Sequence, residues 1–196
     1  TIEIAQQYTD KIFRRTDWQG FGIQRQRAEK QATNDWLFVI DCDEVVPNEL
    51  QQEIIMRITN ANNEQVFYLN RLTRFCGQYI RHSGWYPDKI ARIYNKTHYQ
   101  YNDKLVHESL DCKGSKRVDL KNNLLHYQYD DLAQYIEKRN RYAQFGANEK
   151  IKKGKKSSLS KATSSALFAF IRHYFLKRGF LDGRLGFVIA VIQMQY

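Results

Sequence analysis

The fold is predicted from one stretch of the sequence, Trp36-Leu37-Phe38-Val39-Ile40-Asp41-Cys42-Asp43-Glu44-Val45-Val46-Pro47. Its apolar run, Leu37 to Ile40, contains two β-branched residues and no polar one, which is typical of a strand buried on both faces in a parallel sheet. The run ends in three carboxylates, Asp41, Asp43 and Glu44. Because ligands of open α/β sheets bind at the carboxyl ends of strands, this stretch predicts a site where the strand stops.

The spacing of these acids indicates what the site would bind. Asp41 and Asp43 form an Asp-x-Asp pair, so a turn after the strand can aim both at one point. Like charges so close together cost free energy unless a cation or hydrogen-bond donors offset them. Oxygen ligands suit Mg²⁺ or Mn²⁺, which makes a hard-cation site one interpretation. The other is an ordinary Asp-rich loop or helix cap, and spacing alone leaves both open.

Composition limits the class of protein. The chain has 196 residues, enough for one domain or for one domain with an appended C-terminal part, and its 14% aromatic content argues against disorder. A formal charge of +10 implies an anionic partner, which nucleic acid, an acidic membrane surface or a phosphorylated small molecule would each provide. The three cysteines are too widely spaced for a disulfide framework or a Cys-x-x-Cys metal site, so we expect a reducing cytosol.

Helices and strands are expected to alternate around the opening stretch. A helix from about Ile23 would carry Arg25 and Arg27 in its first turns, where they could bind phosphate or form a solvated basic face. Asn48 is expected to cap the next helix, with an apolar stripe of Leu50, Ile54, Ile55 and Ile58. A strand over residues 65–70 completes a strand-helix-strand pattern, which predicts an α/β fold.

The middle of the chain holds further candidate site residues. In the aromatic loop over residues 81–88, Trp85 and Tyr86 could stack on a sugar or base and hold Asp88 as a general base, or the loop could be an ordinary surface turn. His107 could bind a metal held by the acidic turn, or be a histidine that only makes hydrogen bonds. His126 is predicted to be structural.

The last third of the chain is predicted to be helical, without a run of about 18 apolar residues that could span a bilayer. Lys150 to Lys161 is rich in lysine, glycine and serine, which favours a mobile linker or loop. Apolar helices over residues 167–175 and 187–192 have Arg172, Lys177 and Arg178 nearby. They suit either an interfacial anchor on anionic lipid or a subdomain packed on the sheet.

Five ordered stretches carry a resemblance to a known family: Trp18-x-Gly20-Phe21-Gly22-x-Gln24-Arg25; Asp35-Trp36-Leu37 with Asp41-x-Asp43-Glu44; Gly84-Trp85-Tyr86-Pro87-Asp88; Val106-His107-Glu108; and Gly179-Phe180-x-Asp182-Gly183-x-x-Gly186. They resemble bacterial family-2 glycosyltransferases, and among these the branch that adds sugars to the lipopolysaccharide inner core, described as β-1,4-glucosyltransferases. The resemblance covers nearly the whole chain. It implies a GT-A fold, with a mixed, mostly parallel sheet flanked by helices and a C-terminal helical region.

The resemblance also implies roles for single residues. Asp41 and Arg25 would bind the nucleotide-sugar donor, expected to be UDP-glucose. Asp43 would hold the Mg²⁺ or Mn²⁺ that bridges the donor diphosphate, and His107 would complete that metal site. The expected reaction is an inverting, metal-dependent transfer of a hexose to a lipopolysaccharide core or another lipid-linked glycan.

The base that activates the acceptor is expected to be Asp88, with Glu108 in reserve. We expect a GT-A catalytic domain over residues 1–126, lacking the first strands of the family, and a helical region over residues 127–196. The enzyme would be cytoplasmic and peripheral at the inner face of the bacterial cytoplasmic membrane, with no nucleic-acid partner. Two other functions stay open on the residues alone, a basic nucleic-acid-binding module and a metal-dependent phosphohydrolase.

Overall fold

The computed structural model describes residues 1–103, 108–154 and 156–195. Its contacts divide the chain into two compact units. The first comprises Thr1–Val39, Ala61–Tyr68 and Ala91–Val118, and the second comprises Ile40–Asn60, Leu69–Ile90 and Asp119–Tyr196. Strands β3 (Gln65–Phe75), β5 (Lys89–Asn95) and β6 (Lys116–Tyr129) run through both units.

The described strands form a sheet in the order β1-β5-β3-β6-β2, with β4 (Gln78–Tyr79) paired to β3. Strand β1 (Trp36–Phe38) is antiparallel to β5, and β2 (Glu44–Val45) is antiparallel to β6, where Glu44 lies opposite His126. The β3–β4 pair is antiparallel too. The mixed sheet with flanking helices confirms the α/β, GT-A-type fold. We predicted that most strand pairs would be parallel, but these three pairs are antiparallel.

Strand β1 corrects one prediction. We expected Leu37 to Ile40 to form a strand of a parallel sheet, buried on both faces. The strand is instead Trp36–Phe38, it pairs antiparallel with β5 and it is half-buried, and Ile40, beyond its end, is 43% exposed. The physical reason is its position, because β1 ends the strand order and has a partner on one side only.

The first unit contains helices α1 (Ile2–Ala5) and α2 (Phe21–Gln31) and a core of Val66, Tyr94 and neighbouring tyrosines. Helix α2 confirms the helix expected from about Ile23. It needs Gly22, because a Cβ at that position would lie 2.1 Å from the carbonyl oxygen of Asn102. The glycine-rich approach to α2 therefore serves close packing within this unit.

In the second unit, α3 (Asn48–Ile58) confirms the second predicted helix with two corrections. Pro47 rather than Asn48 is the N-cap residue, and no side-chain hydrogen bond caps the helix there. Leu50 and Ile54 are buried as expected, but Ile55 is 59% exposed. The buried acid Glu53 takes its place on the inner face, since its carboxylate accepts hydrogen bonds from β6.

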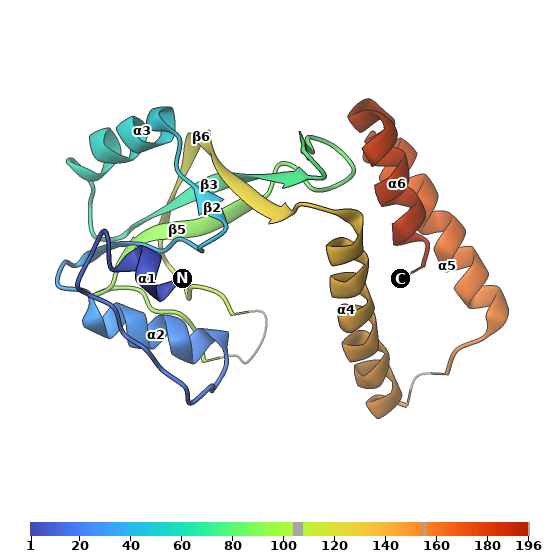
Figure 1. Ribbon diagram of the computed structural model, residues 1–196, viewed down its shortest axis with the longest axis horizontal. Helices are drawn as coiled ribbons and strands as arrows, with labels where there is room; N and C mark the ends of the chain where they lie inside the picture. The colour runs from blue at the N-terminus through green and yellow to red at the C-terminus, as the bar shows by residue number, and fades with distance from the viewer. Residues whose placement is uncertain (104–107, 155, 196) are drawn as a thin grey trace. The chain divides into compact units, whose positions relative to one another are not determined.

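The C-terminal part of the second unit is helical, with α4 (Leu132–Lys152), α5 (Leu159–Ile171), the π-helical segment η1 (Arg172–Leu176), the 3₁₀ segment η2 (Gly179–Asp182) and α6 (Gly183–Gln193). Figure 1 shows α5 and α6 side by side, and they pack against each other. The two ends of the predicted lysine-rich linker belong to the end of α4 and the start of α5. The prediction of a continuous loop over residues 150–161 was therefore wrong.

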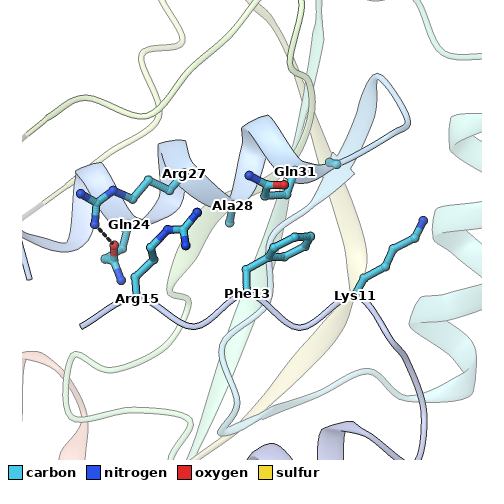
Figure 2. A pocket seen from close by; sticks show the side chains of 8 residues that line it. Lys11, Phe13, Arg15, Gln24, Arg27, Ala28 and Gln31 are labelled. Atoms are coloured by element: carbon cyan, nitrogen blue, oxygen red, sulfur yellow. Dashed lines mark hydrogen bonds between the residues drawn. The ribbon is translucent and has the colours of Figure 1, made fainter. Parts of the chain in front are cut away.

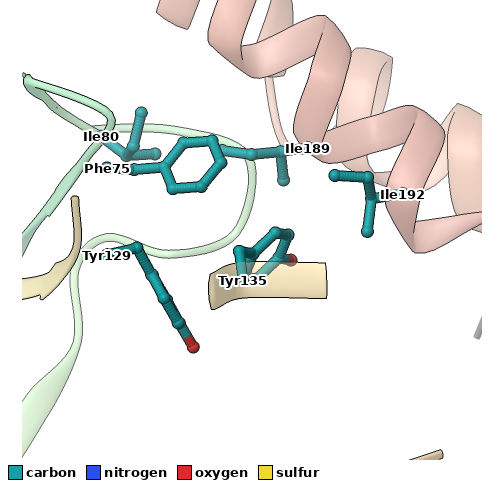
Figure 3. Packing of buried hydrophobic residues seen from close by; sticks show 6 residues of the cluster. All are labelled: Phe75, Ile80, Tyr129, Tyr135, Ile189 and Ile192. Carbon is teal, nitrogen blue, oxygen red and sulfur yellow. The ribbon is translucent and has the colours of Figure 1, made fainter. Parts of the chain in front are cut away.

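The core of the second unit joins these helices to the sheet. Figure 3 shows side chains from the sheet, α4 and α6 converging, and the buried members are Phe75, Ile80, Tyr129, Tyr135, Ile189 and Ile192. Trp85 packs against this cluster, with its ring centroid 5.5 Å from those of Phe75 and Tyr135. The aromatic loop over residues 81–88 is thus attached to the core.

Candidate active site

The acidic turn after β1 is held by one of its own acids. The backbone N–H of Asp41 donates to Glu44 Oε2 at 2.9 Å, and the N–H of Glu44 donates to the Asp41 carbonyl at 3.0 Å. The Glu44 side chain is fully buried and lies 3.8 Å from Arg71 Nη1. Glu44 therefore shapes the turn that carries Asp41 and Asp43, and it faces the Arg71 guanidinium inside the protein.

Asp43, like Asp41, is partly accessible to solvent. Its side chain is 43% exposed, and its Oδ2 lies 3.3 Å from Nε2 of the buried His126. On the other side of the ring, Nδ1 of His126 lies 3.2 Å from the Thr73 hydroxyl. A carboxylate can only accept, so this arrangement gives Nε2 the proton and makes Thr73 a donor to Nδ1. His126, which was predicted to be structural, thus donates its Nε2–H to Asp43 and orients that carboxylate.

Burial lowers the pKa of His126, and the nearby Arg71 lowers it further, against the opposing effect of Asp43 and Glu44. The imidazole is therefore neutral at physiological pH. A neutral ring keeps the single N–H that Asp43 accepts and adds no positive charge to the turn.

Arg71 connects the acidic turn with Asp88. Its Nε and Nη2 lie 2.9 and 2.8 Å from Asp88 Oδ2, and its backbone N–H donates to the Asp88 carbonyl at 2.8 Å. The same guanidinium approaches Glu44. Both of these side-chain contacts involve Oδ2 of Asp88, and neither involves Oδ1. Arg71, which was not predicted as a site residue, thus lies between the Asp88 carboxylate and Glu44 of the turn that carries Asp43.

A cavity of about 350 Å³ lies beside Arg71 and Asp88. Asp88 and Arg71 line it together with Thr73, the aromatic residues Trp85, Tyr129 and Tyr135, and Arg139. Asp43 is connected to this lining through His126 and Thr73. Aromatic side chains and a carboxylate at one cavity are residue types that can bind a sugar, although Tyr129 and Tyr135 are almost fully buried against other rings.

Two other predicted site residues, Arg25 and Glu108, lie in the first unit. Arg25 Nε is 3.2 Å from Glu108 Oε1, and both side chains are less than a fifth exposed. The Arg25 guanidinium also lies 5.1 Å from the centre of the Tyr101 ring. The donor-binding candidate and the reserve base are therefore brought together as an ion pair. His107, the predicted second metal ligand, lies outside the described residues.

A metal at this turn would need ligands from the substrate as well as from the protein. Within the ranges that the structure describes, no group of three or more histidine, cysteine and acidic side chains could hold a metal by itself. Mg²⁺ in nucleotide sites is commonly held by one or two carboxylates together with substrate phosphates. A partly exposed carboxylate such as Asp43 supplies a donor of that kind.

A second cavity, of about 370 Å³, lies in the first unit between α2 and the chain before it. Figure 2 shows Phe13 between Lys11 and Arg15 along one side, with Ala28 of α2 opposite. Arg27, on the helix, is hydrogen-bonded to Gln24 and pairs with Asp17 at 2.6 Å. The apolar floor and cationic rim suit an anion with an apolar part.

Comparison with known proteins gives a family match. The model described as Glycosyl transferase family 2 matches residues 1–124. An uncharacterized glycosyltransferase of Rickettsia prowazekii is 28% identical over 89% of this chain and 63% of its own length. The lipopolysaccharide core biosynthesis glycosyltransferase LpsC of Rhizobium meliloti is 27% identical over 100% of this chain and 74% of its own length. The chain thus spans 63% and 74% of the lengths of these two relatives. No solved structure matches it significantly.

Proposed function

Because the chain belongs to glycosyl transferase family 2, we propose that it moves a hexose from a nucleotide-sugar to a lipopolysaccharide core or another lipid-linked glycan. We assign UDP-glucose as the donor and inversion at the anomeric carbon as the outcome. The name of the Rhizobium meliloti relative supports the choice of acceptor. The observation that carries the proposal is the Arg71 bridge, which joins the acidic turn and Asp88 beside an aromatic-lined cavity.

The proposed reaction is a single displacement. An acceptor hydroxyl in the cavity donates its proton to Asp88, and its oxygen forms a bond to the anomeric carbon as the bond from that carbon to the donor diphosphate breaks. Arg71 fixes Asp88 from the side of Oδ2, so that Oδ1 meets the hydroxyl. Asp41 and Arg25 are proposed to bind the donor. The proton ends on Asp88 and the electron pair on the leaving nucleoside diphosphate.

Asp43 would hold a divalent ion, Mg²⁺ or Mn²⁺, and His107 is proposed to assist. When bound, such an ion supplies positive charge to the leaving diphosphate without a proton transfer. Asp43 suits this role because it is partly exposed while His126 fixes its other oxygen.

Activity measurements on two variants test this proposal. Transfer from UDP-glucose with Mn²⁺ is expected to fall roughly 10²–10⁴-fold in Asp88→Asn, because the general base is lost. It is expected to fall about 100-fold or more in Asp43→Ala, because several kcal/mol of charge stabilisation are lost with the metal ligand. Asp130→Asn, an exposed acid in the same unit, is the control and should retain wild-type activity. Normal transfer by Asp88→Asn together with a large loss in Glu108→Gln would move the role of base to Glu108.

Family membership favours this function over the two alternatives. A phosphohydrolase that uses the same carboxylates would release inorganic phosphate from UDP-glucose or UDP without an acceptor. A nucleic-acid-binding module would show salt-dependent binding to DNA or RNA. Either result without sugar transfer would contradict the proposal.

We also propose a peripheral site on an anionic membrane, with residues 1–126 as catalytic domain and residues 127–196 as the helical region that makes contact. No helix in the described parts of the chain is both long and apolar enough to cross a bilayer. From α5 to α6, however, large apolar side chains are exposed: Leu167, Phe168, Phe175, Leu176, Leu181 and Phe187. Exposed Arg172, Lys177, Arg178 and Arg184 accompany them. Apolar side chains with basic neighbours suit a surface of anionic lipid.

A further inference from the structure

The loop that leads to Asp88 is anchored by a buried carboxylate from the C-terminal helical segments. Asp182, at the end of η2, is 3% exposed. Its Oδ1 and Oδ2 accept hydrogen bonds from the backbone N–H groups of Arg81 and His82, both at 3.0 Å. Oδ2 also accepts from the Ser83 hydroxyl at 2.9 Å, and Oδ1 lies 3.1 Å from His82 Nδ1. A buried carboxylate with this many donors fixes the backbone it contacts.

Segment η1 and the residue after it add to this anchor. The Ser83 N–H donates to the Lys177 carbonyl at 3.0 Å, and His173 Nδ1 lies 2.8 Å from the Ser83 carbonyl. Ser83 is fully buried and has a positive φ of 58°, which a non-glycine residue adopts only where its surroundings enforce it. The start of the loop is therefore held in an unfavourable conformation by contacts from η1 and η2.

The glycines of the predicted Gly179-Phe180-x-Asp182-Gly183-x-x-Gly186 motif bring Asp182 close enough for these contacts. A Cβ at Gly179 would lie 2.6 Å from the His173 carbonyl oxygen and 2.9 Å from Ser83 Oγ. A Cβ at Gly186 would lie 1.8 Å from the Gly179 carbonyl oxygen and 3.0 Å from Asp182 Cβ. The glycines of the motif thus allow η2 to pack closely against the loop.

The other end of the loop is Asp88 itself. Arg71 holds both its carboxylate and its carbonyl. Between the two anchors lie only Gly84 to Pro87, and among them Trp85 packs on the aromatic cluster of the second unit. Four residues thus separate Ser83 from Asp88, and one of them, Trp85, is fixed in the core, so the position of Ser83 restricts where the backbone can place Asp88.

We propose that Asp182 is a positioning residue for the reaction, which sets the place of Asp88 in the cavity by fixing residues 81–83. The assignment rests on the proposed function in one respect only, the role of Asp88 as base. It also gives the C-terminal helical region a task at the site, besides contact with lipid.

Two measurements on Asp182→Asn in the full chain test this proposal. The amide has nearly the same shape but cannot accept with both of its polar atoms. In hydrogen exchange, the amides of residues 81–88 are expected to lose protection by roughly 10-fold or more, while those of α3 keep theirs. In transfer assays, kcat is expected to fall roughly 10–100-fold with the donor KM within about twofold of wild type, because the base is misplaced while donor contacts remain. Ser83→Ala should give smaller effects of the same kind, and Asp130→Asn none.

The outcomes separate the two proposals. Wild-type exchange over residues 81–88 would overturn the anchoring, and a loosened loop with unchanged kcat would overturn the effect on catalysis. A rise in donor KM that accounts for the whole loss in kcat/KM would also overturn the effect on catalysis, since it would indicate lost donor binding. If Asp182→Asn fails to fold, Ser83→Ala decides on the same measurements. If the wild-type protein transfers no sugar, the proposed function fails, and hydrogen exchange still tests the anchor.

Discussion

Glu53 is an acid that α3 directs toward β6 rather than toward water. Its side chain accepts hydrogen bonds from the backbone N–H groups of Lys121, at 2.9 and 3.1 Å, and Asn122, at 2.9 Å, and from the Asn122 amide at 2.8 Å. Burial alone would raise its pKa, but these donors outweigh burial and lower the pKa below 4.5. The ionised carboxylate is therefore part of the folded structure.

We expect Glu53→Gln to lower the free energy of unfolding at pH 7 by about 1–3 kcal/mol. Some of the N–H donors of Lys121 and Asn122 would then face the NH₂ group of glutamine and lose their acceptor. The folded pKa lies below the unfolded one, so the stabilisation is present above pH 4.5 and is lost as pH falls through the folded pKa. Thermal unfolding from pH 7 to pH 3 should therefore show a smaller loss in the variant than in the wild type. Glu49→Gln, exposed on the same helix, is the control. Equal pH dependence in all three proteins would contradict this role of Glu53.

Single residues also show which parts of the site can be predicted. Asp43 and Asp88 were predicted because an acid after an apolar run, or after an aromatic loop, is visible in the local sequence. The contacts of Arg71 with Asp88 and of His126 with Asp43 were not predicted, because these partners lie 17 and 83 positions away in the sequence. No local pattern distinguishes such residues from other polar residues in strands.

Among the helices and strands, identity was easier to predict than environment. The helix periodicity of α3 and the strand character of β3 depend on neighbouring residues and were confirmed. The burial of β1 depends on its place at the end of the strand order, which long-range pairing decides. The apolar run therefore predicted that a strand lies here, but its bounds, its parallel pairing and its burial were predicted wrongly.

The packing of α6 against η2 leads to a stability prediction. Gly186→Ala would place a Cβ 1.8 Å from the Gly179 carbonyl oxygen, and that backbone atom cannot move without shifting η2. We expect a loss of about 1–3 kcal/mol in the free energy of unfolding, measured by urea denaturation. The matched control is Gly146→Ala in α4, where a Cβ meets no atom within 4 Å. There the better helix propensity of alanine should give a gain of up to about 1 kcal/mol. Equal effects of the two substitutions would exclude the close contact as the cause.

For the whole molecule, an ordered set of weak motifs predicted more than any one of them. Asp-x-Asp alone left a loop and a metal site equally open, whereas five stretches in order indicated a family that the match over residues 1–124 confirms. Donor sugar and metal stay predictions, because they depend on groups that the protein binds. The +10 charge likewise implied an anionic partner without identifying it.

Binding to lipid vesicles tests the membrane proposal for the whole protein. We expect binding to phosphatidylcholine vesicles that contain phosphatidylglycerol and much weaker binding to phosphatidylcholine alone, because the basic side chains from η1 to α6 add to the apolar contact. Leu176→Ser and Leu181→Ser, at residues 65% and 55% exposed, should each weaken binding roughly 10-fold.

Arg172→Gln and Arg184→Gln should each weaken binding to the anionic vesicles about fivefold, in line with about 1 kcal/mol for each basic residue near the surface, and should lose this effect at high salt. The matched control is Met56→Ser on α3, which removes an apolar side chain that is 65% exposed outside the C-terminal helices. If Met56→Ser weakened binding as much as Leu176→Ser, the contact would be a general property of exposed apolar residues. Equal affinity for vesicles with and without phosphatidylglycerol would show that the basic side chains do not bind anionic lipid.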